Sequence, residues 1–438
     1  MLLIVVTAGA LLGAATVGAP ERERTPTVDS AVAPSAIGTG DQIPPAQIGS
    51  LASRLTPQVA ARVARIRGLE FERIPVPEVI SGDRFAELTA DEAKPGRGAD
   101  RELADVETAA RMLGVQKPDE QLDILSSGAP DLAAAAYDTE SERLYVIRDA
   151  VGTSRALLEF LLAHELDHAL DDQNFGLDEK EGGNDDRVLA ATALVEGTAT
   201  AVMVDYAAQH LNPLALGAAS VGIDPGTDGV PAFVVEQLTW AYLEGSAFVN
   251  SLRGPGDDWK QVDAAFESQP PRSSEHILHP DKYETGAAPL RVAAPTDELE
   301  TRGWRVLDRG ILGEFSTRQV LEVGAPDDAV EIAATGWGGD QYALLSRDSG
   351  GVDCETTCTG ERVVVVTWRW DSAADATEFE RTLPAYLIAG RNAKKAGAEL
   401  WSLDGAWAAT AIEAHATALA FAPSRELARL AAREAARG

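Results

Sequence analysis

Hydrophobic residues recur at helical spacing in the middle of the chain. Leucines and alanines stand three and four residues apart in 155–172, and an alanine-rich apolar run in 189–209 carries almost no charge. Both patterns predict buried helices, because apolar residues occupy nearly every face. The same period predicts further helices over 57–67, 101–113, 233–252, 313–322, 373–381 and 424–436.

Alternating and β-branched runs predict strands between these helices. Residues 133–137 and 143–147 flank a polar turn, which is the pattern of a β-hairpin. Apolar positions alternate over 71–79 as in an edge strand, and the run 362–370 is rich in valine. Residues 336–339, Gly-Trp-Gly-Gly, are typical of a turn. Separate strands and helices of this kind indicate an α+β fold.

Composition changes along the chain predict four parts. Residues 1–19 are apolar and uncharged and precede a charged run, which predicts an export signal or a retained N-terminal anchor. Residues 20–55 are rich in Pro, Ser, Thr, Ala and Gly, which predicts a disordered linker. The main domain is predicted over 56–292. A polar, Pro-containing boundary separates it from an α+β C-terminal region over 293–438.

The charge balance narrows the classes of partner. The chain has 438 residues, with 38 Lys and Arg against 69 Asp and Glu, and a formal net charge of −31. Such a field repels phosphate backbones and anionic lipid surfaces, so nucleic acid and peripheral membrane binding are not expected. No pattern in the sequence indicates an oligomeric state.

The two cysteines of the chain are expected to differ in redox state between an exported protein and a cytoplasmic one. Cys354 and Cys358 are separated by three residues in a polar stretch, and they are the only cysteines in the sequence. In an exported protein, extracellular or at the cell surface, they are predicted to form a small disulfide loop. The alternative is half of a metal clip, which needs further ligands that this neighbourhood lacks.

A histidine pair with a glutamate lies inside the first buried helix. Residues 164–168 read His-Glu-Leu-Asp-His, an HExxH motif, and composition alone gives about 0.007 such occurrences in this chain. An i, i+4 pair brings two imidazoles to one point, so His164 and His168 are predicted zinc ligands, and Glu165 can reach a water there. The alternative is a helix that carries both histidines without metal. The charge of Asp167 favours that alternative.

The third ligand is predicted on the second apolar helix. Glu196 is the one ionisable residue in the stretch 189–204. A lone carboxylate is costly to bury unless it binds a cation or a buried donor. Its position 28 residues after His168 lets the second helix fold back against the first. The alternatives are a glutamate at an exposed helix end and, for Gly197, either close helix packing or no special role.

These residues together resemble a known family. HELDHALDDQNFGL, ALVEGTA, AAYDTESERLYV, YLEGSAFVNSL and PPRSSEHILHPDKY are similar to exported relatives of the gluzincin zinc peptidases, sometimes labelled peptidase MA-like. The resemblance extends from about Thr56 into the C-terminal region. It implies a zincin-like core made of a β-hairpin edge strand, the HExxH helix and a third-ligand helix. It also implies that His164, His168 and Glu196 hold Zn²⁺ and that Glu165 is the general base.

The chain departs from the family pattern at several positions. Relatives usually read HALQDQHF, whereas Asp171 and Asn174 stand here, and the same two residues exclude the metzincin pattern. Thr200 replaces the Asp that thermolysin-type enzymes carry four residues after the third ligand. Asp172 and Asp205 are therefore the candidates for the groups that orient the histidines.

The predicted loop 270–283 carries the remaining candidate residues. Gluzincins commonly draw an oxyanion donor from a downstream His or Tyr, and the resemblance therefore implies this role for His279 or Tyr283. The alternative for His279 is that it braces the loop.

The sequence thus predicts an exported zinc-dependent metallopeptidase that hydrolyses a protein or peptide substrate. The hairpin within 133–147 is a candidate edge to which an extended peptide adds. The alternatives are a non-catalytic zincin-fold protein that serves as a surface binding or scaffold module, and a zinc hydrolase with another substrate. Zinc content and peptide cleavage separate these functions.

Overall fold

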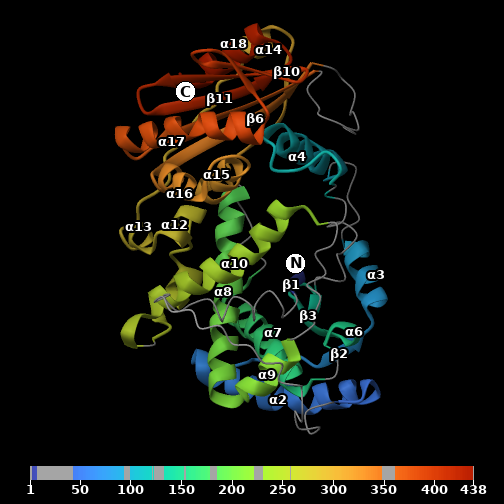
Figure 1. Cartoon of the computed structure of the whole chain (residues 1–438). Helices are drawn as coiled ribbons and strands as arrows, with labels where there is room; N and C mark the ends of the chain where they lie inside the picture. Colours follow the sequence, from blue (N-terminus) through green and yellow to red (C-terminus); the bar gives the residue numbers. More distant parts are fainter. Residues whose placement is uncertain are drawn as a thin grey trace, which may run out of the picture.

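Two hydrophobic regions, one helical and one built on a large sheet, organise the chain (Figure 1). The computed structural model describes residues 2–6, 43–92, 99–120, 122, 133–151, 154–177, 185–220, 230–256, 258–347 and 361–437. Helices and two sheets alternate along these residues, which confirms the α+β class. Most of the predicted export signal and linker, and both cysteines, lie outside the described residues.

A four-stranded sheet lies beside the helical core, in the order β1-β3-β4-β2. Strands β3 (Ala133–Asp138) and β4 (Arg143–Ile147) form the predicted antiparallel hairpin. Strand β2 (Pro77–Ile80) runs parallel to β4, so the predicted strand over 71–79 is regular only at its end. Strand β1 (Leu2–Val6), which the sequence does not predict, runs antiparallel to β3 on its other side.

The N-terminal half of the chain is mostly helical, and most of its helices pack in the helical core. Their bounds are α2 Ile48–Arg67, α3 Gly82–Glu92, α4 Ala99–Leu113, α6 Arg148–Val151, α7 Arg155–Phe175, α8 Asp185–His210, α9 Pro213–Ser220, α10 Ala232–Arg253 and α11 Lys260–Glu267, with 3-10 turns at Pro45–Gln47 and Gly254–Gly256. Helix α2 begins at Ile48 and so includes the last part of the predicted linker. Pro57, which favours a helix start, lies inside this helix instead.

Helix α7 carries the HExxH motif through the helical core. The side chain of Ser154 accepts a hydrogen bond from the backbone N–H of Leu157 at 3.3 Å and caps the start of the helix. Gly176, in the left-handed conformation at φ 66°, ends it. Every residue from 156 to 171 is buried, as the apolar pattern on all faces predicts.

Helices α8 and α10 approach each other closely at two glycines. A Cβ on Gly197 would lie 2.2 Å from the carbonyl carbon of Gly245, and a Cβ on Gly245 would lie 2.1 Å from the oxygen of Ala193. Glycine at both positions permits this contact, which is the close-packing role weighed for Gly197. Helix α8 is also long and apolar enough to cross a membrane, but 72% of its most apolar window is buried inside the protein.

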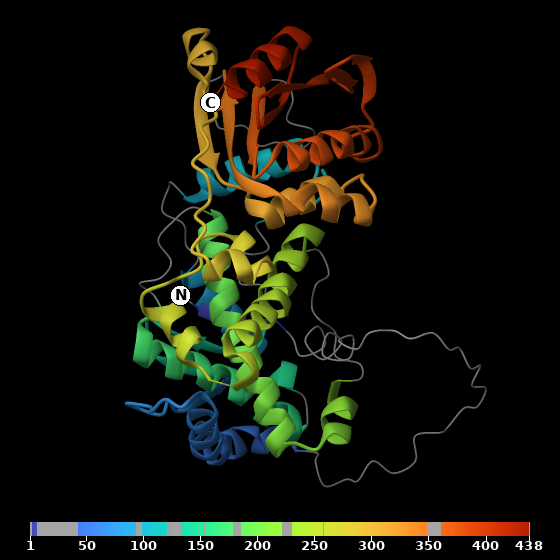
Figure 2. The ribbon, with the colours of Figure 1, turned by 90° about the vertical axis from the view of Figure 1, so that its left-hand side faces the viewer.

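A seven-stranded antiparallel sheet forms the C-terminal region, in the order β5-β6-β7-β11-β10-β9-β8. Helices cover both of its faces (Figure 1 and Figure 2). The bounds are α14 Asp297–Thr301, β5 Arg305–Gly310, α15 Gly313–Glu322, α16 Asp327–Thr335, β6 Trp337–Ser346, β7 Arg362–Trp370, α17 Ala373–Ala385, β8 Lys394–Gly397, β9 Leu400–Leu403, β10 Ala406–Glu413, β11 Ala416–Ala422 and α18 Arg425–Ala435, with a π turn at Tyr386–Gly390. Helices α15, α16 and α17 pack on one face, and α14 and α18 pack on the other.

Helix α4 joins the two regions across the predicted boundary at residue 293. Its residues Ala109, Met112 and Leu113 belong to the hydrophobic cluster under α15, α16 and α17. The hydroxyl of Tyr386 also donates to the carbonyl of Leu113 at 2.5 Å. A helix from the N-terminal half is therefore part of the C-terminal sheet's core.

Two segments differ from the sequence expectation. The predicted turn 336–339 instead opens strand β6, because the backbone of Leu290 packs directly on the glycines and donates to the carbonyl of Gly338 at 2.7 Å. The predicted loop 270–283 contains two short helices, α12 (Ser274–Leu278) and α13 (Pro280–Glu284). Pro280 begins the second helix, as a proline at a first helical position favours.

Candidate metal centre

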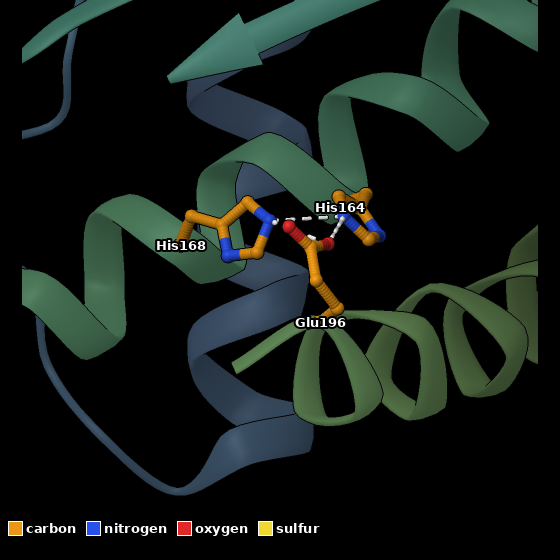
Figure 3. A group of neighbouring side chains, drawn as sticks. All are labelled: His164, His168 and Glu196. Carbon is orange, nitrogen blue, oxygen red and sulfur yellow. Dashed lines mark hydrogen bonds and ion pairs between the residues drawn. The ribbon is translucent and has the colours of Figure 1, made fainter. Parts of the chain in front are cut away.

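Three side chains from α7 and α8 converge inside the helical core (Figure 3). Nε2 of His164 lies 2.9 Å from Nε2 of His168 and 3.1 Å from Oε2 of Glu196. Nε2 of His168 lies 3.4 Å from the same glutamate oxygen. Among the described residues, no other group of His, Cys, Asp and Glu side chains brings three ligand atoms within 4.8 Å of one another.

The spacing of the three atoms fits a tetrahedral metal site. Zinc bonds of about 2.0–2.1 Å at tetrahedral angles place neighbouring ligand atoms about 3.3 Å apart. The observed separations of 2.9, 3.1 and 3.4 Å lie around that value. The i, i+4 spacing on α7 supplies both imidazoles, and α8 supplies the carboxylate, so the residues present fit a metal with two nitrogen ligands and one oxygen ligand.

The protonation states suit metal binding. Burial, assisted by the neighbouring His168, lowers the pKa of His164 to about 4, so its imidazole is neutral at pH 7. Burial raises the pKa of Glu196, but His168 and His164 outweigh it and lower this pKa to about 2. A neutral imidazole and an ionised carboxylate are the forms that act as ligands.

Glu165 lies next to this group without a hydrogen-bond partner. Its side chain is 0% exposed, and neither carboxylate oxygen accepts a hydrogen bond from any residue that the structure describes. Burial, followed by the charge of Glu196, raises the pKa of Glu165 well above its ordinary value, and the backbone of Tyr137 in β3 opposes this shift. A buried carboxyl group of raised pKa beside a ligand cluster is a candidate general base.

His279 and Tyr283, the predicted oxyanion donors, contact other parts of the molecule. Nε2 of His279 lies 2.9 Å from Oε2 of the buried Glu314 on α15, so this imidazole links α12 and α13 to the C-terminal region. The hydroxyl of Tyr283 donates to the carbonyl of Gln269 at 2.8 Å, and its ring packs edge-on against Phe248. The contact of His279 is the bracing role that the sequence left as an alternative.

The two candidates for orienting the histidines also have other partners. Asp172 accepts hydrogen bonds from the hydroxyl of Tyr137 at 3.1 Å and from the backbone of Leu177 at 3.0 Å. Asp205 pairs with Arg253 at 2.6 Å. These contacts fix the ends of α7 and α8. Burial raises the pKa of Asp171, which is 2% exposed, to about 6, and the neighbouring Arg67 and His168 oppose this shift.

Two neighbours of the centre are not predicted from the sequence. The ring of Tyr242 on α10 lies 5.8 Å from the ring of His164. Arg67, at the end of α2, is fully buried and pairs with Asp171 at 3.1 Å and Asp263 at 2.6 Å. Tyr242 begins the segment YLEGSAFVNSL, and the family resemblance of that segment is the one feature of the sequence that points to Tyr242. No pattern in the sequence links Arg67 to carboxylates about 100 and 200 residues away.

Comparison with known proteins gives a family match for part of the chain. Residues 304–430 match a domain of unknown function, DUF8575. A crystal structure of a candidate hydrolase with a novel fold from Chloroflexus aurantiacus is similar at 17% identity and a TM-score of 0.38, and the match covers 56% of this chain and 98% of that one. No curated protein matches the chain. At this level the structural likeness carries no argument about function.

Proposed function

We propose that this chain is a zinc-dependent hydrolase of the metallopeptidase type. The observation that supports the proposal is the convergence of His164, His168 and Glu196 on one point, with the unpartnered carboxyl of Glu165 beside them. Unpaired imidazole and carboxylate groups are costly inside an apolar core, and a bound cation removes this cost for the three ligands.

The residues divide into ligands and a proton carrier. A zinc ion held by the three ligands supplies a Lewis acid that polarises a carbonyl and lowers the pKa of water. Glu165 takes a proton from the attacking water, and the water oxygen bonds to the peptide carbonyl carbon. Glu165 then gives the proton to the leaving amine as the C–N bond breaks, so that one water is consumed and two chain ends form.

The test measures metal and catalysis separately. We expect one zinc per chain by elemental analysis, and its loss in His164→Ala and Glu196→Ala but not in the surface control His415→Ala, whose side chain is exposed. Glu165→Gln is expected to retain zinc and to lose cleavage of a peptide library, because it keeps the shape but cannot carry the proton. Equal zinc in all variants, or equal cleavage by wild type and Glu165→Gln, would overturn the proposal.

A further inference from the structure

The candidate metal centre is closed to solvent. His164 and Glu165 are 0% exposed, His168 is 1% exposed and Glu196 is 4% exposed. A peptide of any kind must displace part of the protein to bring a carbonyl to this point.

Strand β3 and its outer neighbour β1 lie against the helix that carries the motif. Both strands contact α7, and the backbone of Tyr137 in β3 lies near enough to the carboxyl of Glu165 to oppose the rise of its pKa. In the sheet order β1-β3-β4-β2, strand β4 bonds one edge of β3 and β1 bonds the other. Without β1, this second edge of β3 would be unpaired.

The pairing of β1 with β3 has the form of a bound extended peptide. The strands are antiparallel, with Leu3 opposite Tyr137, Ile4 opposite Ala136 and Val6 opposite Ala133. Main-chain hydrogen bonds of this kind accept any extended chain, since they do not depend on side-chain identity. The sequence of the segment, LLIVV, is uncharged and apolar.

We propose that Leu2–Val6 is an intrachain ligand that closes the β3 edge, and that an extended apolar peptide takes its place when it is removed. The identity of the peptide as a substrate rests on the proposed function, whereas its place on β3 does not. Cleavage of the predicted export signal near Pro20 removes the segment. Processing then leaves an open edge on β3, the strand that contacts helix α7 with Glu165 and two of the three metal ligands.

The first experiment uses the full chain and two matched variants. Ile4→Pro/Val5→Pro removes the backbone donor to β3 whichever of the two residues supplies it, because neighbouring N–H groups point to opposite edges. Ile4→Ala/Val5→Ala keeps both donors. Hydrogen exchange of the β3 amides and binding of a fluorescent Leu-Leu-Ile-Val-Val peptide are measured for each protein.

We expect the β3 amides of the proline variant to exchange about tenfold faster or more than those of the wild type, and only this variant to bind the peptide. The alanine variant is expected to behave as the wild type does. Equal β3 exchange in all three proteins, or the absence of peptide binding by a folded proline variant, would overturn the inference. Neither readout uses hydrolysis or zinc, so failure of the inference and failure of the proposed function are distinguished.

If the proline variant does not fold, a cross-link tests whether Leu2–Val6 pairs with β3. In a chain with Cys354→Ser and Cys358→Ser, the pair Ile4→Cys/Ala136→Cys joins residues that face each other across β1 and β3. We expect a disulfide to form on mild oxidation in this pair and not in the control pair Ile4→Cys/Val76→Cys, since Val76 is 81% exposed and lies outside the strands. No disulfide in the first pair, or equal amounts in both, would contradict the placement of β1.

Discussion

Substituting Gly197 by alanine tests the packing that positions the third ligand. The new Cβ would lie 2.2 Å from the carbonyl carbon of Gly245 and 2.4 Å from its oxygen. Both neighbours are backbone atoms, so no side-chain rotation relieves the clash. To reach an ordinary contact of 3.4 Å, α10 must move from α8 by about 1.2 Å.

The expected change in the free energy of unfolding for Gly197→Ala follows from two opposing effects. Overpacking costs about 1–3 kcal/mol, and a clash with backbone belongs at the upper end of that range. Replacing glycine by alanine in a helix returns about 1 kcal/mol. We therefore expect Gly197→Ala to lower the free energy of unfolding by about 2 kcal/mol. Because Glu196 is the adjacent residue, zinc affinity is expected to fall about 10–100-fold, as for other changes that shift a ligand's support.

The control is the same substitution on another helix. Gly217 lies in α9 with no atom within 4 Å of its added Cβ, so Gly217→Ala is expected to stabilise the protein by about 0.5–1 kcal/mol. Urea unfolding gives both free energies, and competition with a chelator gives zinc affinity. The reasoning is refuted if the two substitutions change stability in the same direction, or if Gly197→Ala leaves zinc affinity unchanged.

Two further predictions concern buried charges. Burial raises the pKa of Asp186 to about 8, so this carboxyl binds a proton in the folded state that it lacks unfolded, and stability is expected to fall as pH rises from about 4 through 8. Asp186→Asn removes this dependence. The melting temperature of the variant relative to the wild type is therefore expected to rise towards pH 8 and to show no such rise near pH 4. Arg67→Met leaves the buried Asp171 without its partner and is expected to destabilise the protein by about 3–5 kcal/mol in urea unfolding. Arg84→Met, which breaks an exposed pair with Glu87, is expected to change stability by less than about 1 kcal/mol, and equal effects of the two substitutions would contradict this view of Arg67.

Local patterns in the sequence predicted the elements that carry the centre. The hairpin β3–β4 and the helices α7 and α8 follow from short-range periodicity, which sets which residues are buried. A lone carboxylate in an apolar helix needs a buried partner, and this requirement predicts Glu196 as the third metal ligand. These inferences need no knowledge of how distant segments meet.

Contacts between distant segments were not predictable in this way. The imidazole of His279 meets Glu314, and α4 packs under a sheet that begins about 200 residues later, and neither contact has a local signature. The apolar run at the start of the chain fits an export signal by composition, and the same composition suits a strand, which is how residues 2–6 pair with β3. Tertiary contacts decide whether such an apolar segment forms a strand.

X-ray absorption at the zinc edge of the purified protein tests the metal centre most directly. Two imidazole nitrogens and oxygen ligands at about 2.0–2.1 Å are expected, with one imidazole lost in His168→Ala and none lost in His415→Ala. Sulfur ligands at about 2.3 Å, or an unchanged spectrum in His168→Ala, would contradict a centre made of His164, His168 and Glu196.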